Sequence, residues 1–159
     1  MKTGYSFQTK ENMAKTSFRN INISTKHAIE IFDYIRGRPL STAKRLLQQS
    51  IDKKRAIPIK RFTNGPGHKP GISSGRYHVK ACSMILKALN AVEANAKNKG
   101  LAVQDLRLTY AVAQKAGKQW HYGRKRRALF KNTHIELGVE EVKGLSSKSS
   151  SSKSSKKGN

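Results

Sequence analysis

Two stretches of alternating side chains, separated by a long basic segment, constrain the fold more than any other feature of the sequence. Apolar residues occupy every second position in 106–112 and again in 135–139. Such alternation is typical of strands with one buried face. Residues 115–131 between them contain no Asp or Glu. We predict a β-hairpin of about 106–139 whose distal part, 115–131, leaves the globular body. Because an isolated two-stranded ribbon is only marginally stable in water, we expect it to need a partner.

The charge of the chain indicates the chemistry of that partner. Its 159 residues include 33 Lys and Arg against nine Asp and Glu, a formal net charge of +24. So large an excess of one sign opposes compaction by self-repulsion. Nucleic acid is the polyanion that fits best, because each neutralised phosphate releases counterions. We therefore expect the chain to act when bound to RNA or DNA.

Three helices are predicted upstream of the hairpin. Ser24 stands at an N-cap position, and an apolar face with helical spacing follows before Gly37 and Pro39 end the helix. A second helix begins near Ser41. The longest, about 77–99, has an apolar stripe broad enough to make it the main element of the core.

The remaining segments are predicted to be irregular or extended. Residues 1–16 have no clear period and are expected to form an extended N-terminal arm, whereas 17–23 show a short strand signal. Residues 57–62 are an edge strand or extended loop because of Pro58. Residues 63–76, rich in Gly and Pro, are expected to form a long loop. The Ser/Lys-rich tail, 143–159, cannot bury enough apolar area to order itself and is expected to be disordered.

Aromatic residues suited to RNA binding lie among the basic residues of the hairpin. Aromatic rings can stack on unpaired bases at roughly 1–3 kcal/mol each, while Lys and Arg neutralise phosphates. A nuclear-import signal or a solvated charge run is the alternative interpretation. The candidate RNA-binding residues of the hairpin are Lys115, Lys118, Trp120, His121, Tyr122, Arg124, Lys125, Arg126, Arg127 and Lys131. Those of the Gly/Pro loop and its approach are Lys60, Arg61, Lys69 and Arg76, and those of the helices and their connection are Arg36, Arg38, Lys44, Arg45 and Lys80.

Several classes of function are disfavoured. The single cysteine, Cys82, allows no intramolecular disulfide, sits in an apolar helical stretch and is expected in the core. The acids show no arrangement for general acid–base catalysis, and the histidines have no zinc spacing. His27 and His134 are expected to be structural, whereas His78 and His121 lie in basic surroundings that suit RNA contact. We expect no enzyme activity, metal, cofactor, small-molecule substrate or membrane partner.

The order of several short motifs resembles the universal large-subunit ribosomal protein twenty-two family, called L-seventeen in eukaryotes. The matching blocks are 21–24, 35–39, 43–47, 89–96, 99–101, 105–106 and 134–137. Tyr5-Ser6, Glu11-Asn12 and the Gly/Pro loop are similar to the archaeal and eukaryotic branch. The resemblance covers roughly residues 5–142. The return of the hairpin, Tyr122 to Arg127, departs from the Arg-, Pro- and Gly-rich tip usual in the family.

The resemblance implies an α+β body in which three helices pack on a small three-stranded antiparallel sheet with a long protruding β-hairpin. It implies a globular rRNA-binding domain over 17–142, with no enzyme activity. The expected role is that of a structural constituent of the large ribosomal subunit whose hairpin helps line the nascent-peptide exit tunnel. The expected partners are rRNA, neighbouring ribosomal proteins and the nascent chain, in a cytoplasmic ribosome, with nucleolar assembly if the source is eukaryotic.

Two other readings stay open at this point. The charge and the Ser/Lys tail also suit a basic DNA-binding or chromatin-associated protein, which should prefer duplex DNA equally and not sediment with ribosomes. An extraribosomal regulator acting through protein contacts would need an exposed apolar patch, which the sequence does not show.

Overall fold

The two alternating segments form the centre of a three-stranded sheet. They become β5, Leu106–Lys115, and β6, Thr133–Glu141, which pair antiparallel. β1, Met13–Ile21, pairs with the other edge of β6, so the strand order is β1-β6-β5. The computed structural model describes residues 4–142, and the tail predicted to be disordered lies outside them. β1 begins at Met13 rather than at residue 17, so the last residues of the predicted arm belong to the sheet.

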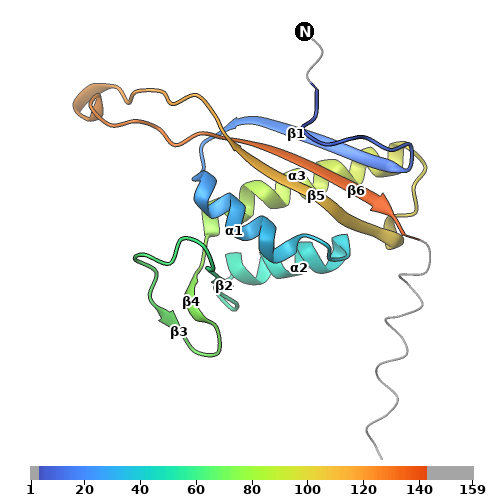
Figure 1. Cartoon of the computed structure of the whole chain (residues 1–159), viewed down its shortest axis with the longest axis horizontal. Coiled ribbons are helices and arrows are strands. Elements are labelled where there is room, and N and C mark those ends of the chain that lie inside the picture. Colours follow the sequence, from blue (N-terminus) through green and yellow to red (C-terminus); the bar gives the residue numbers. More distant parts are fainter. Residues whose placement is uncertain (1–3, 143–159) are drawn as a thin grey trace, which may run out of the picture.

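Three helices cover one face of this sheet (Figure 1). They are α1, Thr25–Ile35, α2, Leu40–Ile51, and α3, Val79–Asn98, and each starts within two residues of the predicted start. α3 packs on β1 and β6, while α1 packs on β5. Fully buried side chains such as Ile85 and Leu89 of α3 lie against the sheet's inner face. The prediction of an α+β fold with three helices and an antiparallel sheet is confirmed.

A β-bulge changes which side chains of β5 face the helices. Leu108 pairs with Val139, but the next pair joins Tyr110 to Gly138, so Thr109 is the extra residue. An extra residue reverses the alternation beyond it, because the side-chain period of a strand is two. Ala111 is therefore buried in the core, and Tyr110 leaves it. The prediction that Tyr110 and Val112 continue the buried face of Leu106 and Leu108 was wrong for this reason.

Tyr110 instead lies under the N-terminal segment on the outer face of the sheet. Its ring stacks on Phe7, with centroids 4.8 Å apart and planes 7° apart. The Ser6 hydroxyl and backbone N–H both donate to Oε2 of Glu136, at 2.6 and 2.9 Å. Arg19 pairs with the other oxygen of Glu136 at 3.3 Å. Residues 6–7 thus cover part of the face that a simple alternation would leave in water.

A second, smaller sheet lies beside the helices. It contains β2, Ile57–Pro58, β3, His68–Lys69, and β4, Ser73–Arg76, in the order β2-β4-β3. The prediction that residues 63–76 form a loop without strands was therefore wrong in part. Gly75 of β4 is buried, and a Cβ added to it would lie 2.6 Å from Cδ1 of Ile72. A side chain at this position would therefore require the Ile72 side chain to move.

The connection between β5 and β6, residues 116–132, is called the β5–β6 loop here. Regular pairing ends at Lys115 and Thr133. Beyond it, backbone N–H groups of Ala116, Phe130 and His121 donate across the loop, and a short 3-10 turn, Gly123–Lys125, closes its end. Figure 1 shows this loop extending away from the helices. The antiparallel pairing of β5 and β6 is confirmed, whereas the long protruding β-hairpin stays a prediction.

Candidate nucleic-acid interface

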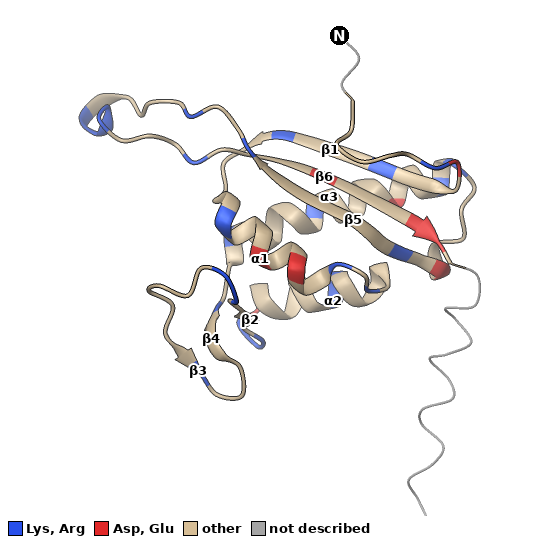
Figure 2. Cartoon of the chain, viewed as in Figure 1, with Lys and Arg blue, Asp and Glu red and all other residues tan. Residues whose placement is uncertain are grey.

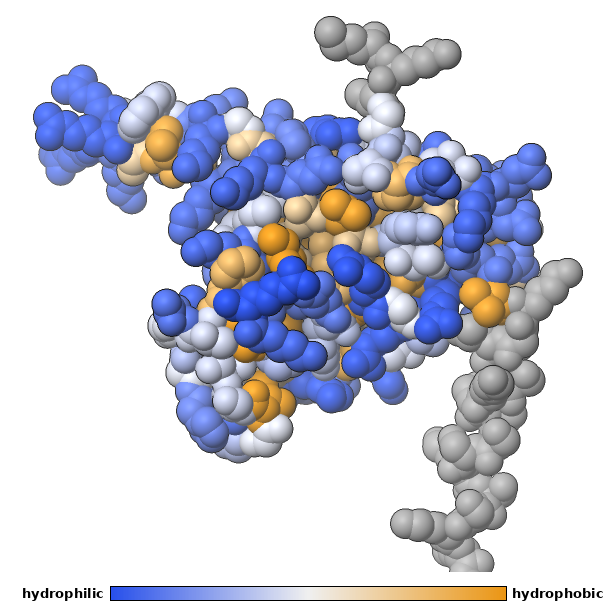
Figure 3. All heavy atoms as spheres, viewed as in Figure 1, coloured by the Kyte–Doolittle hydropathy of each residue, from blue (hydrophilic) through white to orange (hydrophobic). Residues whose placement is uncertain are grey.

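The β5–β6 loop presents cations and aromatic rings together. The rings of His121 and Phe130 stack with centroids 3.5 Å apart, and a backbone bridge joins Trp120 to Leu129. These contacts leave Trp120 64% and Tyr122 89% exposed. The loop contains no Asp or Glu, and within residues 4–142 no ion pair engages its Lys and Arg side chains. Figures 2 and 3 show its basic residues and its mostly hydrophilic surface, broken by a small apolar patch.

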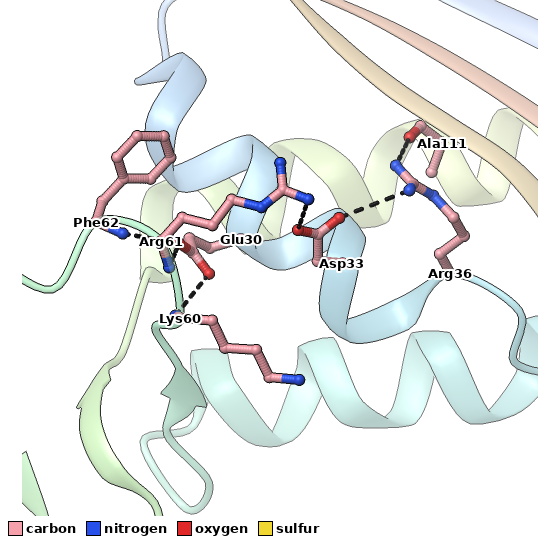
Figure 4. A network of polar contacts seen from close by, with 7 residues as sticks. All are labelled: Glu30, Asp33, Arg36, Lys60, Arg61, Phe62 and Ala111. Atoms are coloured by element: carbon pink, nitrogen blue, oxygen red, sulfur yellow. Dashed lines mark hydrogen bonds and ion pairs between the residues drawn. The ribbon is translucent and has the colours of Figure 1, made fainter.

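A buried carboxylate fixes the backbone of the second group of predicted RNA-binding residues, those of the Gly/Pro loop and its approach. Glu30 of α1 is only 2% exposed, and its two oxygens accept the backbone N–H groups of Lys60, Arg61 and Phe62 at 3.0, 2.8 and 3.2 Å (Figure 4). The carboxylate thus fixes the backbone while leaving the Lys60 and Arg61 side chains outside. A carboxylate suits this role because hydrogen bonds to charged acceptors are the stronger ones. Glu30 was not predicted as part of the site.

The side chains of this group are exposed or partly engaged. Arg61 pairs with Asp33 at 3.1 Å, and the Lys69 ammonium lies 5.6 Å from the centre of the Tyr77 ring. Lys60 and Arg76 are exposed. The four predicted residues of the Gly/Pro loop and its approach are therefore gathered around the β2-β4-β3 sheet and the start of α3.

The third group consists of the predicted residues of the helices and their connection. Several of them make hydrogen bonds or ion pairs within the fold. Arg36 donates to the Ala111 carbonyl at 2.6 Å and lies 3.6 Å from Asp33, which secures the end of α1 to β5 (Figure 4). Arg38 donates to the Tyr34 carbonyl at 2.9 Å. Lys44 pairs with Glu93 of α3, and this hydrogen bond is the main cause that lowers the pKa of Glu93. Arg45 and Lys80 are exposed. RNA binding by this group stays a prediction.

The histidines divide differently from expectation. His78 is only 5% exposed, so its ring is packed into the fold, and RNA contact by it stays a prediction. Its ring lies 4.2 Å from that of His27, and its Nε2 has no hydrogen-bond partner in the described part of the chain. Burial, with help from nearby His27 and Arg76, lowers the pKa of His78 to about 4. His134 is structural as predicted, since its Nδ1 accepts the Asn20 N–H at 3.1 Å.

The low pKa of His78 predicts acid sensitivity. A histidine in the unfolded chain takes up its proton near pH 6.5, whereas His78 in the folded protein takes it up only near pH 4. The folded state is thus not penalised by neutral His78 above pH 6.5, and its free energy of unfolding decreases as the pH falls from 6.5 towards 4. We expect urea unfolding to show a loss of about 2 kcal/mol between pH 7 and pH 5, and a much smaller loss in His78→Gln. Equal acid sensitivity of the two proteins would contradict the assignment.

Other chemistry finds little support in the described chain. Within residues 4–142 no group of His, Cys, Asp and Glu is placed to hold a metal ion, and no helix there is long and apolar enough to cross a bilayer. Cys82 is buried, as predicted, and burial raises the pKa of its thiol to about 11. A thiol with so high a pKa is a poor nucleophile. Exposed cations and rings around a small α+β body are the features of a nucleic-acid-binding protein.

Comparison with known proteins identifies the family. The family described as Ribosomal protein L22p/L17e matches residues 16–139. The chain is 40% identical over 141 residues to the large ribosomal subunit protein uL22 of Nanoarchaeum equitans, covering 84% of this chain and 81% of the relative. It is 38% identical over 151 residues to the uL22 of Methanosphaera stadtmanae, covering 89% and 98%. The uL22 of Methanocella arvoryzae is 47% identical over 105 residues, covering 64% and 69%.

The chain belongs to the ribosomal protein L22p/L17e family. It is thus a structural constituent of the ribosome rather than an enzyme, as the sequence predicted. The three relatives named are archaeal, in agreement with the resemblance of the N-terminal motifs to the archaeal and eukaryotic branch.

Proposed function

We propose that this protein is a structural constituent of the large ribosomal subunit that binds rRNA through its body and extends the β5–β6 loop into the RNA. The named relatives are large-subunit proteins, which supports this place in the ribosome. The observation that carries the proposal is the loop itself, with six cations between residues 117 and 131, two exposed rings and no acid. RNA provides both the phosphates and the unpaired bases that such a loop can bind.

The finer part of the proposal concerns the exit tunnel. The loop leaves the body on a narrow stem and bears both cations and rings at its end, which suits a segment surrounded by rRNA on several sides. In the family that the sequence resembles, this segment helps line the nascent-peptide tunnel. We extend that role to residues 116–132, with the nascent chain and neighbouring ribosomal proteins as further partners. Since the named relatives are archaeal, nucleolar assembly is not part of the proposal.

Sedimentation tests the proposal most directly. The tagged protein, expressed in its source cells or in a related archaeon, should comigrate with large subunits in a sucrose gradient and remain there at high salt. If the protein is absent from the large-subunit peak and binds duplex DNA as well as it binds rRNA, the DNA-binding alternative is favoured instead. The small-subunit peak, recovered from the same gradient, serves as the internal control.

A further inference from the structure

The N-termini of α1 and α3 lie side by side, and neither is capped by a side chain. His27, in the first turn of α1, contacts His78, the residue that precedes α3, with ring centroids 4.2 Å apart. Neither Ser24 nor His78 forms a side-chain cap hydrogen bond, and neither first turn contains an acid. Both termini therefore direct unpaired N–H groups and the positive ends of their dipoles towards the same region.

A row of adjoining hollows passes over these two termini. One, of about 370 Å³, lies between the start of α1 and the base of the β5–β6 loop. The next, of about 240 Å³, shares Ser24 and Lys131 with it and reaches Lys80 of α3. A third, of about 300 Å³, shares His27 and Lys80 and is lined by His78. A fourth, of about 240 Å³, continues from His27 to Arg61 beside the β2-β4-β3 sheet.

The charge along this row is mostly positive. Its lining includes seven cations and a single acid. That acid is Glu30, whose oxygens are already occupied by the backbone N–H groups of Lys60, Arg61 and Phe62. The cations are Lys26, Arg61, Arg76, Lys80, Lys115, Lys118 and Lys131. A chain of phosphates about one nucleotide apart is the ligand that matches such a row.

His78 supplies an independent sign of a missing ligand. It is 5% exposed, it lines the third hollow, and its Nε2 has no partner among the described residues. A buried polar atom without a partner is rare and needs an explanation. An oxygen of a bound phosphodiester would satisfy it together with the N–H groups of the first turn of α3.

We propose that the adjoining N-termini of α1 and α3 form a phosphate-binding site for the backbone of one RNA strand. This site joins the cations at the base of the β5–β6 loop to those beside the β2-β4-β3 sheet. The two basic groups that the sequence presented separately are thus the ends of a single track, with Lys26, His27 and His78 at its centre. The inference rests on the proposed function, because it specifies how the body holds RNA.

The substitution Ser24→Asp separates binding from folding. Asp is as good an N-cap as Ser and its charge suits a helix N-terminus, so the melting temperature should stay equal or rise. The same carboxylate would lie where the phosphate belongs. We expect it to weaken binding of a twelve-nucleotide oligouridylate about tenfold and to lower the salt slope by about one. Asn90→Asp, which adds the same charge on an exposed position of α3, is the matched control and should change affinity less than about twofold.

Amide NMR provides the second measurement. Oligouridylate should shift the amide signals of residues 25–27 and 79–81 in the wild-type protein. Equal affinities of the two variants, or shifts confined to the β5–β6 loop, would overturn the inference and leave the proposed function standing. Shifts with millimolar inorganic phosphate but none with oligouridylate would also overturn it, since they would indicate a site for free phosphate. Failure of the wild-type protein to bind any RNA would overturn both.

Discussion

A protein in which an Asn-Gly turn replaces residues 117–131 is expected to keep its fold and to lose RNA affinity by about a thousandfold at 0.1 M salt. The replacement removes six cations and no acid. If each contacts one phosphate, the log–log salt slope falls by about four, since single strands contribute about 0.7 for each contact. At moderate salt such a slope corresponds to three or more decades of affinity.

The body should tolerate this change because the loop is bonded mainly to itself. Within the described chain, no hydrogen bond or ion pair joins residues 118–131 to the helices or to β1. Ala116 N–H donates to the Asn132 carbonyl at 3.1 Å, and this pair can close a two-residue turn. Circular dichroism and urea unfolding should therefore match the wild-type protein within about 1 kcal/mol.

A second variant separates charge from stacking. Changing the six cations of residues 117–131 to Gln keeps Trp120 and Tyr122 in place, so it should retain part of the affinity while the salt slope falls as in the deletion. Fluorescence anisotropy with a large-subunit rRNA fragment measures both quantities. An unfolded body, or a deletion that binds as tightly as the wild type, would show that the division into body and loop is mistaken.

The helices could be predicted because their signals are local. The apolar stripes of α1, α2 and α3 repeat within each segment, and caps or breakers mark their ends. β6 was predictable for the same reason, since Ile135, Leu137 and Val139 all face the core. The basic residues of the β5–β6 loop were visible because they are consecutive in the sequence.

The structural features that could not be predicted from the sequence depend on contacts between distant segments. The bulge at Thr109 follows from pairing with residues about thirty positions later, so alternation alone could not reveal that Tyr110 points outwards. The N-termini of α1 and α3 meet only because both helices pack on one sheet, and no motif near His27 or His78 indicates it. Distant contacts also affect Lys44, which was predicted to bind RNA but forms an ion pair with Glu93 of another helix.

Glu30 is the clearest example of information that only the fold supplies. Seen in the sequence, it lies on the side of α1 opposite the apolar stripe and so resembles a solvated helix residue. Residues 60–62 fold over that side and bury it, with three backbone N–H groups donating to its oxygens. One of the nine acids of this strongly basic chain is therefore a structural element of the proposed interface.

Glu30→Ala is expected to lower stability by about 2–4 kcal/mol and to weaken RNA binding although it raises the net charge. Hydrogen bonds to charged acceptors contribute about 1.5–3 kcal/mol each, and the freed N–H groups recover part of this from water. Without the carboxylate, the backbone at Lys60 and Arg61 is no longer fixed, so Arg61 loses its position beside the row of hollows.

The direction of the change in affinity decides between positioning and charge. Removing an acid strengthens electrostatic attraction to RNA, so a protein that binds through net charge alone should bind more tightly after Glu30→Ala. Glu11→Ala removes the same charge from an exposed position and is the matched control, with an expected affinity equal to or slightly above the wild type. Glu30→Gln keeps one carbonyl acceptor and should fall between Glu30→Ala and the wild type in stability. If Glu30→Ala and Glu11→Ala bind the rRNA fragment alike under conditions where both are folded, the interface does not depend on how Glu30 holds residues 60–62.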